Sequence, residues 1–536
     1  MHLVVFHYHL RAGGVTGVIR DAVTVLLEDE TVQRVTLVSG TEENLEGLQE
    51  RITGTLPDRA ADRMATTVHP ELRYAADIAG FDVAATTARL KQILVDRYVA
   101  ADAVWWVHNH HLGKNPAVTQ AFVEVLAAHP RQRCILEIHD FPEAGRYRNL
   151  AYLTDNTSAD PYPVLPNVHY AVLNHRDGSV LRDAGIPADH VSILQNPVRS
   201  MPTDRPHAPP GLSASTLAQR YSGIDPDGAL LLYPVRCIRR KNVLEAATLA
   251  RLLAERTGRP MNLLVTLPGL SDQERRYSQM IEDAYARGVI PGAFGLGEEL
   301  DELGLSFTDL MSGADLVLST SIQEGFGYAF FEGLASGTPL LARYLDVLAG
   351  TEALFEPFHA EFYTRLEVPF TSPSLSDVRP YLRSRYDEQL DTVVPHLPAE
   401  AAAALEAQVD ELLGGETIDF SFLMPQMQYS VVTDLRDETF RREVAELNEE
   451  LVARAAALLG RRNEGGNRVV QERYGGAAFR DAFRTAVDAV NRRSGSGRAA
   501  AGPEPDASQS GMGEIQARVV RRFATVEYLR LLYSGI

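Results

Sequence analysis

The sequence has few of the residues that build a disulfide framework. It contains two cysteines in 536 residues, Cys134 and Cys237, and both stand in apolar, strand-like surroundings far apart along the chain. Two thiols are too few to ligate a structural metal, and their setting is typical of buried thiols in a reducing compartment. A disulfide-stabilised fold and a cysteine metal site are therefore excluded.

Lysine and long apolar runs are also scarce. The only lysines are Lys91, Lys114 and Lys241, and nearly all other basic residues are arginine. No apolar run approaches the roughly 18 residues of a membrane span. The N-terminus, MHLVVFHYHL, has no basic leader region and runs directly into a predicted strand. We therefore expect a cytoplasmic protein that does not enter the membrane.

The charge balance excludes further partners. A formal net charge of −19 would repel nucleic acid and anionic bilayers, so any anion that the protein binds must be held locally. The apolar and charged fractions, 45% and 23%, are those of a globular protein, and the length suits two domains with additional segments. The formation of a homo-oligomer stays an open possibility.

Short apolar runs alternate with helical patterns along the first 200 residues. The runs HLVVFH, RVTLVS, AVWWVH, RCILEI, VHYAVL and VSIL are predicted strands, and their spacing indicates a parallel sheet with helices on both faces. We therefore predict an N-terminal Rossmann-like domain over residues 1–200. The Pro-rich segment PVRSMPTDRPHAPP, residues 197–210, interrupts the pattern, and we predict a linker over 201–228.

The same alternation resumes over residues 229–475 and predicts a second Rossmann-like domain. Its predicted strands are ALLLYPV, MNLLVTL, DLVLS and PLLAR. Asn242 with Glu245 resembles a capping box, which predicts a helix directly after the first of these strands. The rhythm breaks at about 351–422, which we interpret as an insertion. Helices over 476–536, with a flexible segment at about 494–512, are expected to pack back on the N-terminal domain.

The segment from Glu324 to Glu332 (EGFGYAFFE) carries the strongest signal for a ligand site. It passes from a predicted strand through a glycine turn into a predicted helix, and helix N-terminal N–H groups favour an anion. The two carboxylates flank this turn and can accept hydrogen bonds from sugar hydroxyls. On spacing alone, an ordinary turn with a solvated glutamate on a surface helix is an equally good interpretation.

A basic segment, Arg236 to Asn242 (RCIRRKN), follows another predicted strand. Ligands of open α/β sheets bind beyond the carboxyl ends of the strands, where these cations would meet a diphosphate. We interpret Arg236 and Lys241 as ligand-binding cations. We interpret Arg239 and Arg240 as parts of a solvated basic turn.

Three clusters follow strands of the first domain. Gly13 and Gly14 would let a ligand approach the backbone of the first strand-to-helix turn. His139, beside Asp140, is interpreted as an active-site histidine, although a histidine satisfied within a loop fits almost as well. Residues 108–111 (HNHH) have a metal-like composition. In an extended segment, however, neighbouring side chains point to opposite faces, and no carboxylate stands at metal-ligand spacing on a helix, so we predict no metal site.

Taken in order, these segments resemble the retaining GT-B glycosyltransferases of the family 4 type, the group 1 transferases with a Glu-x7-Glu motif. The resemblance covers most of residues 1–350 and 437–493, and its most specific part is Glu324 to Glu332. It implies an α/β fold with two Rossmann-like doubly wound domains facing across a cleft, an insertion in the second domain and C-terminal helices. It rests on Gly13-Gly14, His139-Asp140-Phe-Pro, Asn174 to Asn196-Pro197-Val198, Arg236 with Lys241-Asn242, Glu324 to Glu332, and Asn467 to Tyr474.

The resemblance also implies a role for each candidate residue. Arg236 and Lys241 would neutralise the donor diphosphate, and Glu332 would hold the ribose hydroxyls. Gly13 and Gly14 would approach the phosphates from the other domain, and His139 would contact the transferred sugar. The donor sugar would be held by Glu324, Gly325, Phe326, Gly327 and Tyr328. The implied catalytic set is His139, Glu324, Arg236 and Lys241.

The implied enzyme is a hexosyltransferase that uses a UDP-, GDP- or ADP-sugar and a small-molecule or glycan acceptor. It would retain anomeric configuration and need no metal and no tightly bound cofactor. Fixed cations and helix-terminus amides would stabilise the charge that builds on the departing nucleoside diphosphate. Two alternatives stay open: an inactive GT-B-fold binding or scaffold protein, and a phosphorylase or epimerase on the same fold.

Overall fold

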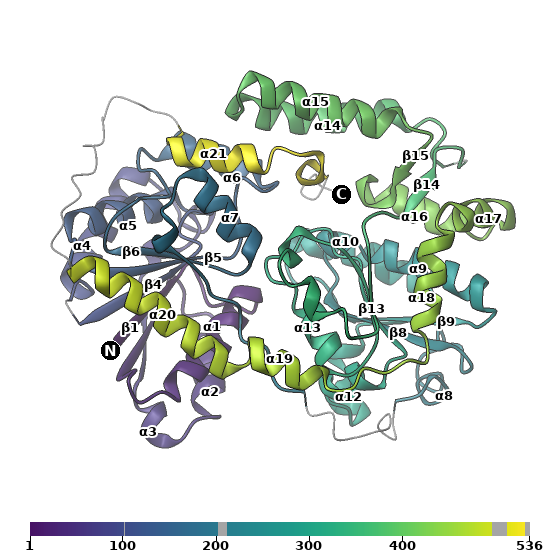
Figure 1. The fold of residues 1–536 in the computed structure, drawn as a ribbon, viewed down its shortest axis with the longest axis horizontal. Helices are drawn as coiled ribbons and strands as arrows, with labels where there is room; N and C mark the ends of the chain where they lie inside the picture. Colours follow the sequence, from purple (N-terminus) through teal and green to yellow (C-terminus); the bar gives the residue numbers. More distant parts are fainter. Residues whose placement is uncertain (101, 202–211, 373, 496–511, 531–536) are drawn as a thin grey trace. The chain divides into compact units, whose positions relative to one another are not determined.

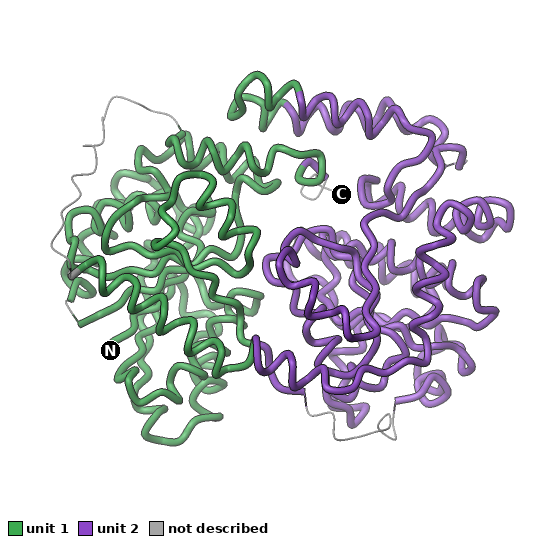
Figure 2. The backbone as a smooth tube through the Cα atoms, viewed as in Figure 1, with its two compact units in different colours: residues 1–197, 391–403, 474–528 green, residues 198–390, 404–473, 529–536 purple. Residues whose placement is uncertain are grey.

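The computed structural model describes residues 1–100, 102–201, 212–372, 374–495 and 512–530. They form two compact units (Figure 2). The first unit comprises residues 1–197, 391–403 and 474–528, and the second comprises the described residues of 198–390, 404–473 and 529–536. Residues 202–211 of the predicted linker and 496–511 of the predicted flexible segment lie outside the described residues.

A seven-stranded parallel sheet forms the centre of the first unit (Figure 1), in the order β3-β2-β1-β4-β5-β6-β7. All six strands predicted for the first 200 residues are present. The sequence pattern missed β3, because it is an edge strand and most of its side chains are only partly buried. The strands are β1 (His2–His7), β2 (Arg34–Ser39), β3 (Met64–Val68), β4 (Ala103–His108), β5 (Arg133–Ile138), β6 (Val168–Val172) and β7 (Val191–Ile193).

Helices cover both faces of this sheet, and the alternation of apolar side chains along β1 shows why. Val4 and Phe6 point into a core shared with α4 and α5, whereas Leu3 and Val5 point into the opposite core, shared with α1, α2 and α20. The helices are α1 (Gly14–Leu27), α2 (Leu45–Thr53), α3 (Asp58–Ala61), α4 (Val83–Arg97), α5 (Pro116–Ala128), α6 (Tyr147–Asn156), α7 (His175–Ala184), α20 (Gly476–Gly495) and α21 (Glu514–Arg522).

The two C-terminal helices of the first unit are tied into its cores. Phe479 and Phe483 of α20 are buried in the core that also contains Trp106 of β4. Val519 of α21 and Phe523 just after it are buried in the core on the opposite face. These helices therefore complete the two apolar layers of the first unit.

A six-stranded parallel sheet forms the centre of the second unit, in the order β10-β9-β8-β11-β12-β13. The four predicted strands are present. The last strand, β13, comes from the residues predicted as an insertion and pairs in parallel register with β12. The strands are β8 (Ala229–Arg236), β9 (Met261–Leu267), β10 (Gly292–Phe294), β11 (Leu316–Ser319), β12 (Leu340–Arg343) and β13 (Ala360–Tyr363).

A buried ion cluster anchors the rest of the predicted insertion to this sheet. Arg343, at the end of β12, is 1% exposed and pairs with Glu245 at 2.7 Å and with Asp419 at 2.8 Å. The hydroxyl of Tyr363 also donates to Glu245, at 2.5 Å. The segment attached in this way contains β14 (Glu367–Pro369), α14 (Arg379–Val393), α15 (Ala399–Gly414) and β15 (Thr417–Asp419).

The remaining helices of the second unit surround its sheet. Among the described residues, no helix combines the length and the apolar character needed to cross a membrane. The helices are α8 (Ala214–Leu217), α9 (Val243–Thr257), α10 (Asp272–Ala286), α11 (Leu300–Leu303), α12 (Phe307–Gly313), α13 (Tyr328–Ala335), α16 (Pro425–Asp434), α17 (Glu438–Leu447), α18 (Glu449–Leu458) and α19 (Gly466–Tyr474).

Candidate active site

The predicted donor residues follow two neighbouring strands of the second unit. β8 pairs with β9 on one side and with β11 on the other, so the order of strand addition reverses between β8 and β11. Open α/β sheets bind ligands beyond the carboxyl ends of the strands at such a switch point. Arg236 and Lys241 follow β8, and the segment from Glu324 to Glu332 follows β11. The topology therefore brings both predicted segments to one place.

An ion cluster joins the two loops. The carboxylate of Glu324 pairs with the ammonium of Lys241, and it also accepts a hydrogen bond from Arg240 at 3.0 Å. The side chains of Lys241 and Glu324 are only 14% and 10% exposed. Burial raises the pKa of Glu324, but Lys241 and Arg240 outweigh it and lower that pKa to about 2. Burial lowers the pKa of Lys241. The cluster is therefore ionised and keeps a net positive charge.

Hydrogen bonds to three backbone carbonyls fix the turn that carries Lys241. The hydroxyl of Tyr233 donates to the carbonyl of Lys241 at 2.5 Å. The hydroxyl of Thr320 donates to the carbonyl of Asn242 at 3.0 Å, and the N–H of Ile322 donates to the carbonyl of Arg240 at 2.9 Å. These contacts hold the loops after β8 and β11 together, so the charged side chains are positioned before any ligand binds.

The interpretation of Arg239 and Arg240 as a solvated basic turn was wrong. Arg239 is 8% exposed and donates to the carbonyl of Leu423 at 2.9 Å, because the turn packs against the segment after β15. Arg240 donates to the carbonyl of Gln323 at 2.8 Å as well as to Glu324. Arg240 therefore belongs to the ion cluster, and Arg239 anchors the turn.

The predicted capping box at Asn242 was also wrong. Helix α9 does begin after Asn242, but this residue is left-handed, with φ 54°, and its side chain makes no capping hydrogen bond. Its amide donates instead to the carboxylate of Glu245 at 2.6 Å. Arg343 holds that carboxylate, so Glu245 belongs to the buried ion cluster and not to a cap.

The glycine turn leads directly into α13, as the sequence predicted. Gly327 precedes the helix with φ 87°, and a Cβ there would lie 2.5 Å from the ring of Phe330. Phe326 is buried and stacks on Phe331, with ring centres 4.9 Å apart. Tyr328 and Glu332 lie one helical turn apart on α13, and Glu332 is partly exposed. Gly325, also partly exposed, lies between Glu324 and Phe326 in this turn.

Arg236 ends β8 and lies beside the start of α10. Its guanidinium is 3.7 Å from the carboxylate of Glu274, which caps α10 through a capping box with Ser271. The Arg236 side chain is 26% exposed. Arg236 is thus the third cation near the switch point, after Lys241 and Arg240, and Glu274 at the start of α10 orients its guanidinium.

In the first unit, the order of strand addition reverses between β1 and β4. His139 follows β5, next to β4 in the sheet. Its Nε2 lies 2.8 Å from Nδ1 of His108 and 3.2 Å from Glu137, whose other oxygen accepts from the indole of Trp106 at 2.6 Å. Burial lowers the pKa of His139 to about 3 and raises that of Glu137 to about 8. Burial therefore favours the neutral forms of His139 and Glu137 in this hydrogen-bonded trio.

Sequence reasoning missed the contribution of Glu137 and the shape of residues 108–111. These residues are not extended, because Asn109 is left-handed with φ 55°. Glu137 stands directly beside His108 in the register of β4 and β5, so a search for a carboxylate on a helix could not find it. The ligand atoms of His108, Glu137 and His139 lie within 4.8 Å of one another, a spacing that could hold a metal ion.

Gly13 and Gly14 are exposed at the start of α1. Gly13 has extended backbone, with φ 178°. A Cβ on Gly13 would meet its nearest neighbour at 3.9 Å, and one on Gly14 would meet nothing within 4 Å. The fold itself therefore does not require glycine at either position.

Comparison with known proteins adds to this geometry. No family model matches the chain. The mannosylglucosyl-3-phosphoglycerate synthase of Petrotoga mobilis is 27% identical over 544 residues, which cover 99% of this chain and 99% of that protein. The chain is a glycosyltransferase. Its two Rossmann-like units confirm the predicted α/β, GT-B fold class.

Two solved structures have a partly similar fold. A glycosyltransferase from Rickettsia africae has a TM-score of 0.49 and 12% identity, and the match covers 91% of this chain and 98% of that one. The sucrose-phosphate synthase of Thermosynechococcus elongatus has a TM-score of 0.43 and 14% identity, over 85% and 99% of the two chains.

Proposed function

We propose that this enzyme transfers a hexose from a nucleoside-diphosphate sugar to a hydroxylated acceptor with retention of anomeric configuration, as family 4 transferases do. The cluster of Lys241, Arg240 and Glu324 at the switch point of the second unit carries this proposal. Arg236 adds a further cation at the end of β8. A pyrophosphate is the ligand that such a concentration of fixed positive charge suits in an otherwise acidic protein.

The proposed chemistry needs no metal. As the bond to the sugar breaks, negative charge builds on the leaving diphosphate, and Arg236, Arg240 and Lys241 stabilise that charge more than they stabilise the ground state. The acceptor hydroxyl attacks the face that the diphosphate vacates, which retains configuration. A neutral His139 is suited to hydrogen-bond a hydroxyl of the transferred sugar, because a neutral imidazole both donates and accepts.

The other candidate residues complete the donor site. Glu332 would accept hydrogen bonds from the ribose, and the backbone from Gly325 to Tyr328 would hold the sugar beside Glu324. Gly13 and Gly14 would admit the phosphates close to the backbone of the first unit. The steric freedom at both glycines supports this role, because the fold gives no other reason for them.

We infer a small acceptor of the glycerate class. The relative from Petrotoga mobilis, a mannosylglucosyl-3-phosphoglycerate synthase, is named for the synthesis of a sugar-linked phosphoglycerate. The full-length match to that protein supports a related acceptor here. UDP-, GDP- and ADP-sugars are all candidate donors.

Two alternatives are less well supported. A scaffold protein that had lost transfer could keep the Lys241–Glu324 pair for stability, but it would not need Arg236 and Arg240 beside that pair. A pyridoxal-type phosphorylase needs a free lysine at its cofactor. Lys91 pairs with Glu124 and Lys241 pairs with Glu324, and Lys114 belongs to the first unit and not to the turns after β8 and β11.

A nucleotide panel tests the proposal. UDP, GDP, ADP and their hexose conjugates are added to the purified chain, and the melting temperature and the release of free sugar are measured. One nucleotide series should raise the melting temperature and support slow hydrolysis, and NMR of the product of transfer should show the anomeric configuration of the donor. The enzyme proposal fails when no nucleotide shifts the melting temperature.

A further inference from the structure

Lys114 differs from the other lysines in the surroundings of its ammonium group. Lys91 and Lys241 each pair with a glutamate. Lys114 is partly buried, and within the described ranges its ammonium makes neither a hydrogen bond nor an ion pair. Its one close contact is with the face of Tyr74, at 5.4 Å from the ring centre. A partly buried charge without a counter-ion is costly, so this position favours a bound anion.

The loop that carries Lys114 is held in place by its neighbours. Gly113 is left-handed, with φ 70°, and a Cβ there would lie 2.2 Å from the carbonyl oxygen of Asn149. The carbonyl of Lys114 accepts from the N–H of Ala75 at 2.8 Å. The side chain of Asn115 donates to the carbonyl of Arg73 at 2.7 Å. The backbone of Lys114 is therefore fixed before a ligand arrives.

A second cation faces the same place. Arg146 immediately precedes α6, and its guanidinium lies 3.2 Å from Asp140. Burial lowers the pKa of Lys114, the positive charge of Arg146 lowers it further, and the negative charge of Asp140 raises it, so both neighbouring charges act on the ammonium. The side chain of Asn149 on α6 donates to the carbonyl of Leu112 at 3.1 Å, so the two loops are in contact.

The acidic groups nearby do not cancel this charge. Asp140 is matched by Arg146. Glu43 and Asp77 both form ion pairs with Arg11, at 2.7 and 3.4 Å. All three side chains are exposed, so these ion pairs are weak. Lys114 is left as the excess positive charge at the carboxyl ends of β1, β4 and β5. His139, next to Asp140 in the chain, lies at the same edge of the sheet.

We propose that Lys114 and Arg146 form an anion subsite in the first unit that binds a phosphate or carboxylate group of the acceptor. Tyr74 forms an aromatic wall beneath the ammonium. This inference rests on the proposed transferase function, since it assigns the anion to the acceptor. It adds that the acceptor must carry a negatively charged group, and it names the two residues that bind this group.

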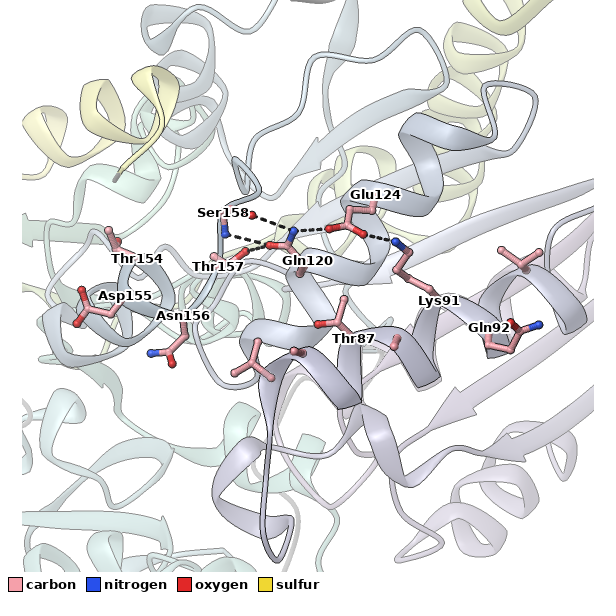
Figure 3. Close-up of a pocket in the computed structure, with 14 residues that line it drawn as sticks. Thr87, Lys91, Gln92, Gln120, Glu124, Thr154, Asp155, Asn156, Thr157 and Ser158 are labelled. Atoms are coloured by element: carbon pink, nitrogen blue, oxygen red, sulfur yellow. Dashed lines mark hydrogen bonds and ion pairs between the residues drawn. The ribbon is translucent and has the colours of Figure 1, made fainter. Parts of the chain in front are cut away.

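A groove elsewhere on the first unit does not compete for this role. It lies between α4, α5 and the segment after α6 and encloses about 850 Å³ (Figure 3). Its cation, Lys91, already pairs with Glu124, and Glu124 also accepts from Gln120. The groove therefore offers no free positive charge, but Lys91 provides a matched control for Lys114.

Binding to the full-length chain tests the subsite. Calorimetry is run with glycerol 3-phosphate, glycerate, inorganic phosphate and neutral glycerol. At least one anion should bind and glycerol should not, and the comparison of the first two probes identifies phosphate or carboxylate as the group recognised. Lys114→Met should weaken that binding by about tenfold or more, Lys114→Arg should restore most of it, and Lys91→Met should leave it unchanged.

The outcomes distinguish a failure of the anion-subsite proposal from a failure of the transferase proposal. Nucleotide binding should be the same in Lys114→Met and in the wild type. If nucleotides bind but no anion does, or if Lys114→Met binds anions normally, the subsite is overturned and the transferase proposal stands. Lys114→Met should also melt at or above the wild-type temperature, because it removes an unpaired charge. A clear drop would make Lys114 a structural residue and overturn the subsite.

Discussion

Lys241 and Glu324 form a nearly buried ion pair that joins the turn after β8 to the turn after β11. The two residues are 83 positions apart in the chain. The parallel pairing of β8 with β11 brings the carboxyl ends of both strands to the same edge. Each side chain therefore depends on the other for its position, and the two motifs recognised separately in the sequence act as one structural element.

Replacing Glu324 by Gln should cost both stability and activity. The change leaves Lys241 and Arg240 without their carboxylate, and breaking a buried pair costs about 3 kcal/mol or more. Donor-dependent turnover should fall by roughly 100-fold, because the cations lose their fixed positions. Chemical denaturation and a steady-state transfer assay measure the two effects.

Glu302→Gln is the matched control for that variant. Glu302 pairs with Arg220, but it is 69% exposed, so its loss should cost less than about 1 kcal/mol and leave turnover unchanged. Equal effects of the two substitutions would show that the Glu324 pair is an ordinary surface contact.

Gly13→Ala should weaken donor binding without destabilising the fold. A Cβ fits at Gly13 without a close contact, so the melting temperature should not fall, whereas the KM for the donor should rise about tenfold or more. Gly17→Ala, in the same helix, also adds a methyl group to open space and should stabilise the chain by up to about 1 kcal/mol with an unchanged KM. An unchanged KM in Gly13→Ala would remove this turn from the donor site.

The sequence predicted the two sheets well because their central strands are continuous apolar runs. It missed β3, β10 and β13, which lie at sheet edges and need less apolar sequence. It also predicted correctly that Arg236, Lys241 and Glu324 lie at the carboxyl ends of strands. It could not identify Glu137, because that contact depends on the register between β4 and β5. The burial of Arg239 depends on residues almost 200 positions away, which no local pattern reveals.

The stability of the first unit should depend on pH through Glu143. This carboxyl group is fully buried, accepts from Tyr162 at 2.9 Å and from Gln516 of α21 at 3.2 Å, and burial raises its pKa from 4.5 to about 7. A raised carboxyl pKa stabilises the folded state below pH 4.5, and this stabilisation is lost as the pH rises through 7. The loss amounts to about 3 kcal/mol.

Glu143→Gln should flatten this dependence, since an amide does not ionise. Unfolding free energies of the wild type and the variant, measured at intervals from pH 4.5 to 8, check the prediction. The difference between the two proteins should change steadily from pH 4.5 to about 7 and level off above that. A constant difference would show that Glu143 is ionised throughout, as an exposed carboxylate would be.

Metal removal should leave transfer unaffected. Nδ1 of His108 lies 2.8 Å from Nε2 of His139, a hydrogen-bond distance shorter than the roughly 3.3 Å between two ligands of a tetrahedral zinc ion. Chelation with EDTA should therefore change neither turnover nor melting temperature, and elemental analysis should find no stoichiometric zinc. A bound metal ion that is lost in Glu137→Gln would establish the trio as a metal site instead.

The anchoring of residues 364–423 through Arg343 bears on how such a segment can be gained or lost in evolution. Without Asp419, the guanidinium of Arg343 would face Glu245 alone, and without Leu423 the buried Arg239 would lose a carbonyl partner. The turn after β8 has thus come to depend on the segment. A viable descendant that loses the segment must also replace Arg343 and Arg239, so these positions should change together among homologues that differ in this region.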